Sequence, residues 1–146
     1  MEEPAAPVAP ASKLVMIIDD DVSMRDFMGY IVKKEGFRSE LSADGREALR
    51  KIDAAAPDLI LLDFMIPGMG GYEVLRELQA TGHGDIPIIV VTGREMDGAS
   101  VNLLLQEGNV KDFLQKPVGP TKLAAAMHRV LGTAPTNPPR KASSGW

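Results

Sequence analysis

Short apolar runs alternate with longer amphipathic segments through the middle of the chain. The apolar runs have the length of buried strands, and the amphipathic segments repeat apolar residues at the spacing of helices. We expect strands at residues 14–18, 38–41, 58–63, 86–91 and 110–115. We expect helices at residues 22–36, 44–55, 71–81, 94–108 and 120–131. The pattern predicts consecutive strand–helix units.

Several of the expected strands contain a continuous apolar run, with the sequences LVMII, LILL and IIVV. A continuously apolar strand is buried on both faces, which is typical of a parallel sheet covered by helices. The predicted fold class is therefore α/β, with a doubly wound parallel sheet. Ligands of such sheets bind beyond the carboxyl ends of the strands, near the point where the strand order reverses.

The two ends of the chain differ in composition from its middle. Residues 1–12 are rich in Pro and Ala, residues 133–146 are rich in Pro, Ser and Thr, and neither has apolar periodicity. We expect both to be disordered tails. A chain of 146 residues with 45% hydrophobic content has enough material for one sizeable core, so we expect a single domain at residues 13–132.

Composition argues against several classes of protein. The net charge of −4 and the lack of a basic stripe argue against direct binding of nucleic acid. The lack of cysteine excludes disulfides and thiolate metal sites. The N-terminal sequence lacks the pattern of a secretory signal, and no apolar stretch approaches the roughly 20 residues that span a bilayer. We expect a cytoplasmic protein that has no membrane partner.

Acidic residues gather where two strands are expected to end. Asp19, Asp20 and Asp21 follow the first strand, and Asp63 ends the third. Because parallel strands end at the same edge of a sheet, we expect these carboxylates to converge. Two carboxylates about 5 Å apart repel by roughly 3 kcal/mol at an effective dielectric near 20. A cation is therefore expected among them.

The residue types indicate which cation this is. Oxygen ligands without nearby His or Cys favour a hard cation, and a small number of protein ligands suits Mg²⁺ (or Mn²⁺) better than Ca²⁺. A carboxylate-held metal is typical of phosphoryl transfer, which also uses a hydroxyl and a lysine. Thr92 ends the fourth strand and Lys116 follows the fifth. Each residue alone has an ordinary structural explanation, but together they indicate a site.

Between about residues 13 and 131 the sequence resembles the receiver domain of two-component response regulators. The resemblance rests on four stretches that occur in the family's order: IIDDDVSMR, LLDFMIPGMGGYEVLRELQ, PIIVVTG and DFLQKPV. It implies the flavodoxin-like (βα)5 receiver fold with strand order 2-1-3-4-5. The implied architecture is a stand-alone receiver similar to chemotaxis regulators. The alternative, that the chain is a fragment of a longer regulator or of a hybrid kinase, stays open.

The resemblance implies a role for each acidic residue. Asp20 is expected to bind Mg²⁺ directly and Asp19 mainly through water, with Asp21 outside this pair. Asp63 matches the phospho-acceptor of the family. Met65, two residues later, is expected to offer its backbone carbonyl to the metal.

The resemblance also implies how the signal is relayed. Thr92 matches the switch hydroxyl, Lys116 matches the lysine that pairs with the phosphoryl oxygens, and a cis bond is implied before Pro117. Phe113 occupies the position of the family's switch aromatic residue, but it lacks the hydroxyl of the tyrosine often found there. Asn109 departs from the alanine that is common before the fifth strand.

The implied function is that of a phosphorylation switch. Asp63 would take a phosphoryl group from a phosphohistidine of a sensor histidine kinase or phosphotransfer protein, or from a small acyl phosphate, in a Mg²⁺-dependent reaction. The chain would catalyse only its own phosphorylation and dephosphorylation. The face formed by the fourth helix, fifth strand and fifth helix would then bind a downstream protein effector.

Three alternatives remain beside this hypothesis. A Mg²⁺-dependent phosphatase would want an acid two residues after Asp63, where Met65 stands, and a flavodoxin-like nucleotide binder would want a glycine-rich loop in place of DDDVSM. A phosphorylation-independent interaction module would not need the acids, threonine and lysine.

We expect His83 in a loop and His128 on a surface helix, and we expect neither to be a metal ligand or a catalytic group.

Overall fold

A computed structural model describes residues 9–64, 66, 69–93 and 96–135. Its centre is a five-stranded sheet in which every neighbouring pair is parallel, in the order β2-β1-β3-β4-β5. The strands are β1 (Leu14–Ile18), β2 (Arg38–Ser42), β3 (Leu59–Leu62), β4 (Ile88–Thr92) and β5 (Val110–Gln115). The expected fold class and strand order are confirmed.

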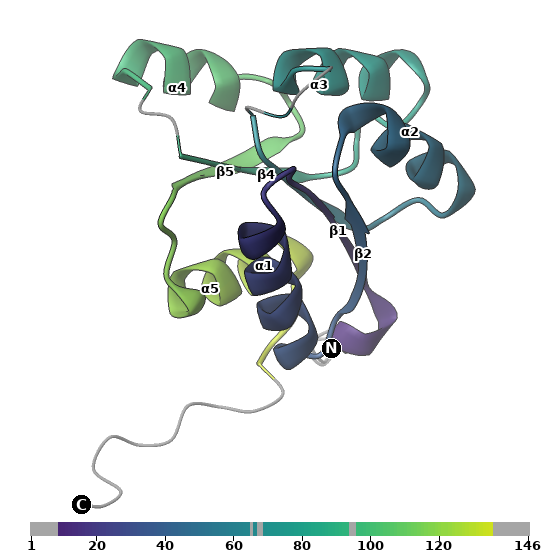
Figure 1. Cartoon of the computed structure of the whole chain (residues 1–146), viewed down its shortest axis with the longest axis vertical. Coiled ribbons are helices and arrows are strands. Elements are labelled where there is room, and N and C mark those ends of the chain that lie inside the picture. Colours follow the sequence, from purple (N-terminus) through teal and green to yellow (C-terminus); the bar gives the residue numbers. More distant parts are fainter. Residues whose placement is uncertain (1–8, 65, 67–68, 94–95, 136–146) are drawn as a thin grey trace, which may run out of the picture.

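Helices cover both faces of the sheet. They are α1 (Val22–Lys34), α2 (Gly45–Ala54), α3 (Gly71–Ala80), α4 (Gly98–Leu105) and α5 (Pro120–Leu131). Helices α1 and α5 lie on one face, and α2, α3 and α4 lie on the other (Figure 1). This two-sided cover explains the continuously apolar strands, because each of them supplies alternate residues to two separate cores.

Strand β1 illustrates this division. Val15 and Ile17 pack in the core beneath α1 and α5, whereas Met16 and Ile18 pack in the core beneath α2, α3 and α4. All four side chains are buried. Packing on both faces fixes the backbone of β1 up to its carboxyl end. The acidic residues begin at this end.

A β-bulge changes the direction of side chains in β5. Ile88 pairs with Val110 but Ile89 pairs with Asp112, so Lys111 is the extra residue. Beyond the bulge, Phe113 packs with the core on the α4 side and Leu114 with the core on the α5 side. The bulge therefore decides which helices Phe113 faces.

The start of α4 differs from the expected residue 94. The helix begins at Gly98, because Asp97 is its N-cap and the Asp97 carboxylate accepts a hydrogen bond from the Ser100 N–H at 2.7 Å. The other helices start within one residue of the expected positions. A capping side chain, and not apolar spacing, sets where α4 begins.

The expected tails lie largely outside the described residues. In the part of residues 1–12 that is described, Pro10–Ser12 form a 3-10 helix against β2, and Pro10 is buried. Arg38 holds this turn by donating to the carbonyl oxygens of Ala11 and Ser12. Among the described residues, no helix combines the length and apolar character needed to cross a membrane.

Candidate functional site

The turn between β1 and α1 carries three consecutive acids in different surroundings. Asp19 continues the sheet, since its N–H donates to the Ser42 carbonyl at 3.1 Å, and its side chain is fully buried. Asp21 is the N-cap of α1 and accepts from the Met24 N–H at 3.2 Å. Asp20, between them, is exposed. The sequence DDD thus divides into a buried acid, an open acid and a helix cap.

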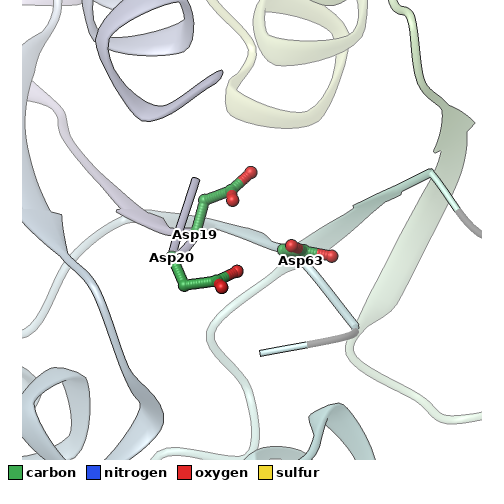
Figure 2. Close-up of side chains that lie close together, drawn as sticks. All are labelled: Asp19, Asp20 and Asp63. Atoms are coloured by element: carbon green, nitrogen blue, oxygen red, sulfur yellow. The ribbon is translucent and has the colours of Figure 1, made fainter. Parts of the chain in front are cut away.

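Asp63 comes to the same edge from β3. Its N–H donates to the Ile18 carbonyl at 2.9 Å, and the residue is 5% exposed. Asp19, Asp20 and Asp63 each offer a carboxylate oxygen, and these oxygens lie within 4.8 Å of one another. Figure 2 shows the three side chains gathered at the ends of β1 and β3. The expected convergence of carboxylates is found for these three acids, whereas Asp21 caps α1 instead.

Lys116 brings a positive charge to this cluster. Its Nζ donates to Asp19 Oδ2 at 2.7 Å and to Asp63 Oδ2 at 3.4 Å. The lysine side chain is 15% exposed, so the two ion pairs are shielded from bulk water. The bond between Lys116 and Pro117 is cis, as expected.

The charge state of Lys116 follows from two opposing effects. Burial lowers the pKa of its ammonium group, but the hydrogen bond to Asp19 and the attraction of Asp63 and Asp19 outweigh that effect. The pKa of Lys116 is consequently raised above its usual value of 10.5. The lysine is a cation throughout the neutral range.

Thr92 and Phe113, the expected switch residues, lie on β4 and β5. Thr92 ends β4, is fully buried, and its carbonyl accepts from the Lys116 N–H at 2.9 Å. Phe113 is half-buried and its backbone pairs with Val90 of β4. Met65, the expected carbonyl ligand, lies outside the described residues.

One contact at the site was not expected from the sequence. Arg25, in the first part of α1, donates from Nη1 to the backbone carbonyl of Asp19 at 3.0 Å. Its position four residues after the Asp21 cap is the only sequence signal, because that spacing returns a side chain to the start of its helix. Arg25 is thus a second cationic residue in contact with this turn.

The donor set suits a hard divalent cation. Three carboxylates and one ammonium leave a net negative charge at the cluster, and the exposed Asp20 keeps it open to solvent. Carboxylate oxygens with room for water are ligands that Mg²⁺ accepts. The residues present therefore fit the expected metal, with Asp19, Asp20 and Asp63 as the groups that could hold it.

Both histidines pair with residues outside the acidic cluster, but His128 differs from expectation. It was expected on the surface of a helix, and it is only 6% exposed. Its ring contacts Glu35 through Nε2 at 2.7 Å and Thr133 through Nδ1 at 2.6 Å. Packing of α5 on α1 buries this side, which helix periodicity alone did not reveal. His83, in a loop as expected, pairs with Asp53.

Comparison with known proteins gives the same family along most of the chain. The family model described as response regulator receiver domain matches residues 15–128. The sensory transduction protein RegX3 of Mycobacterium tuberculosis is 36% identical over 117 residues, covering 80% of this chain and 50% of that protein. The DNA-binding response regulator MtrA of Mycobacterium leprae is 35% identical over 117 residues, with 80% and 50% covered. The chain spans about half the length of these curated relatives.

Solved structures agree with the sequence relatives. The receiver domain of the sensor histidine kinase PA1611 from Pseudomonas aeruginosa is 30% identical, with a TM-score of 0.73 and with 83% of this chain and 98% of that chain covered. The receiver domain of a LuxO repressor protein from Vibrio parahaemolyticus is 28% identical, with a TM-score of 0.74 and with 82% and 89% covered. An acidic pocket with a lysine is typical of receivers that accept a phosphoryl group. The chain belongs to the response regulator receiver domain family, the signalling modules of two-component systems.

Proposed function

We propose that Asp63 accepts a phosphoryl group from a phosphohistidine of a sensor histidine kinase or phosphotransfer protein. The observation that carries this proposal is the pairing of one ammonium group, Lys116 Nζ, with both Asp19 and Asp63 inside a cluster of three carboxylates. Receiver domains partner with histidine kinases. The particular kinase of this chain would be chosen by surface contacts that lie outside the acidic cluster.

The proposed step is an in-line displacement at phosphorus. An Asp63 carboxylate oxygen forms a bond to phosphorus while the P–N bond of the phosphohistidine breaks. The electron pair of that bond goes to the leaving imidazole nitrogen, which takes a proton from solvent. Lys116 stays protonated, because its pKa is raised by Asp19 and Asp63 despite burial, and its ammonium group would offset charge on the transferring oxygens.

The proposed metal requirement rests on the same cluster. The Mg²⁺ held by Asp19, Asp20 and Asp63 would neutralise phosphoryl charge and align its oxygens. The solved PA1611 receiver domain, which is similar to this chain, has a magnesium ion coordinated in its active-site cleft. Without a cation, the three carboxylates would repel the incoming phosphoryl group.

The proposed output is a change in the face formed by α4, β5 and α5. Phosphorylation adds negative charge at Asp63, and the Thr92 hydroxyl would move to meet the new oxygens. Phe113, half-buried on the α4 side, would then change its packing. Leu103 and Leu105 of α4 are 61% and 41% exposed, so this face offers apolar contact area to a protein effector.

Incubation with acetyl phosphate and Mg²⁺ tests the proposed acceptor. The wild-type chain is expected to gain the mass of one phosphoryl group, in a linkage that is stable to acid and labile to base. Asp63→Asn should gain none. Asp21→Asn is the matched control, because asparagine also caps helices and Asp21 lies in the same acidic turn but outside the cluster.

The same assay separates the competing functions. A phosphatase would release inorganic phosphate continuously without a stable adduct on Asp63. A phosphorylation-independent interaction module would stay unmodified at every Mg²⁺ concentration. Either result would remove the proposed phospho-acceptor role.

A further inference from the structure

The β1–α1 turn fixes Asp20 through the two peptide groups that flank it. The carbonyl of Asp19 accepts a hydrogen bond from Arg25 Nη1 at 3.0 Å. The N–H of Asp21 donates to the Asp19 carboxylate, at Oδ1, at 2.9 Å. Because the Asp20 side chain is exposed, its place beside Asp63 depends on the backbone that carries it. One of the two hydrogen bonds that hold this backbone comes from Arg25.

Arg25 is itself fixed to the turn that it holds. Its N–H donates to the Asp21 carbonyl at 2.9 Å, within the first turn of α1. The Arg25 side chain is half-buried, so its aliphatic part cannot move freely. This restricts the position of the guanidinium group. The start of α1 and the acidic turn therefore form one hydrogen-bonded unit.

We infer that Arg25 is a positioning residue for the metal site, acting through the Asp19 carbonyl to hold the Asp20 carboxylate in place. The inference rests on the proposed function, because it assigns Asp20 to the Mg²⁺ site. Arg25 neither binds the metal nor contacts the phosphoryl group in this role. Its contribution is to hold the turn in the binding geometry before the cation arrives.

A positioning role and a purely electrostatic role predict opposite effects on the metal. The guanidinium charge repels a divalent cation, so if charge alone mattered, removal of Arg25 would strengthen Mg²⁺ binding. If the hydrogen bond to the Asp19 carbonyl matters more, its removal weakens Mg²⁺ binding, because the turn must then be ordered at the expense of binding free energy. The sign of the change distinguishes the two.

The test is calorimetric titration of the metal-free full chain with Mg²⁺. We expect Arg25→Ala to weaken Mg²⁺ binding by about three- to tenfold. Arg25→Lys keeps the charge but not the planar donor group, and is expected to fall between wild type and Arg25→Ala. Lys33→Ala is the matched control, because Lys33 is an exposed cation in the last turn of the same helix. It should bind Mg²⁺ like the wild type.

Hydrogen exchange of the metal-free protein gives a second readout that does not involve phosphorylation. The Asp21 amide donates inside the turn, so Arg25→Ala should speed its exchange, whereas Lys33→Ala should not. Thermal melting of the same samples shows whether Arg25→Ala stays folded. If Arg25→Ala does not stay folded, the same two measurements are made on Arg25→Lys.

Two results would overturn the inference. One is Mg²⁺ binding by Arg25→Ala that equals or exceeds the wild type; the other is exchange of the Asp21 amide that matches the wild type. Failure of the proposed function looks different: the wild type itself would take no phosphoryl group from acetyl phosphate. If the wild type is phosphorylated and Arg25→Ala binds Mg²⁺ like the wild type, only the role of Arg25 is contradicted.

Discussion

Lys116 Nζ lies 2.7 Å from Asp19 Oδ2 and thereby joins the end of β5 to the end of β1. These strands are not neighbours, since β3 and β4 lie between them in the sheet. Asp63 follows β3 at the same edge of the sheet, and Lys116 contacts its carboxylate as well. One lysine thus links the edge strand β5 to the two acids at the centre of the site.

Removal of this lysine should destabilise the protein. In Lys116→Met the buried Asp19 and Asp63 carboxylates lose their shared cation, so the free energy of unfolding without metal should fall by about 1–3 kcal/mol. Urea unfolding at neutral pH measures the change. Lys111→Met is the control, an exposed lysine of the same strand, and should stay within about 0.5 kcal/mol of the wild type. Equal stability of the two variants would contradict the role given to Lys116.

The pH dependence of this effect follows from the raised pKa of Lys116. Burial alone would lower it, but the hydrogen bond to Asp19 and the charges of Asp63 and Asp19 raise it in the folded state. A raised pKa gives stability that is complete below the unfolded-state value, about 10.5, and is lost as pH rises through the folded-state value.

The stability difference between wild type and Lys116→Met should therefore stay constant from about pH 7 to pH 9 and shrink only above about pH 10.5. Urea unfolding of both proteins across this range, without divalent metal, measures it. A difference that disappears between pH 7 and pH 9 would show that the lysine loses its proton too early for the proposed pairing.

Asp20 should affect metal binding and stability in opposite directions. Asp20→Asn removes one of three mutually repelling carboxylates, so the metal-free protein should melt at the same or a higher temperature than the wild type. Mg²⁺ should raise the melting temperature of the wild type by mass action, and much less that of Asp20→Asn. Thermal melting with and without Mg²⁺ gives both numbers. An equal Mg²⁺ response in the two proteins would remove Asp20 from the metal site.

The segment after Asp63 depends on a glycine at the start of α3. A Cβ placed on Gly71 would lie 2.6 Å from Phe64 Cγ, closer than side chains approach one another. Phe64 follows the acceptor and packs edge-on against Tyr72, with ring centroids 4.8 Å apart. We expect Gly71→Ala to displace the Phe64 ring and destabilise the fold by about 1–3 kcal/mol, measured by urea unfolding.

Gly98→Ala is the matched control for this substitution. Gly98 also starts a helix, α4, but a Cβ there meets nothing within 4 Å. Its replacement should be neutral or slightly stabilising, by up to about 1 kcal/mol, because alanine favours helix more than glycine does. A Gly71→Ala variant as stable as Gly98→Ala would show that Phe64 moves aside freely.

The acid cluster could be predicted from the sequence because it follows from one rule of parallel sheets. Strands that run in the same direction end at the same edge, so the sequence predicts that Asp19, Asp63 and Lys116 lie together. The structure confirms that these three meet. The prediction needed only strand positions, which continuously apolar runs indicate well.

Other features could not be predicted from the pattern of apolar residues. Arg25 reaches a backbone carbonyl, for which its spacing from Asp21 is the only sequence signal, and the bulge at Lys111 comes from pairing between β4 and β5. His128 is buried because α5 packs on α1, although a histidine on a surface helix is ordinarily exposed. The start of α4 was misplaced because Asp97 caps the helix after a polar stretch.

Chemical trapping of the phosphorylated residue tests the central claim most directly. Borohydride reduces an aspartyl phosphate to homoserine, which marks its position in the chain. After incubation with acetyl phosphate and Mg²⁺, peptide mass spectrometry should find homoserine at residue 63 of the wild type and none when Mg²⁺ is withheld. Homoserine at Asp19 or Asp20 instead of Asp63, or at none of the three, would contradict the claim that Asp63 is the phospho-acceptor.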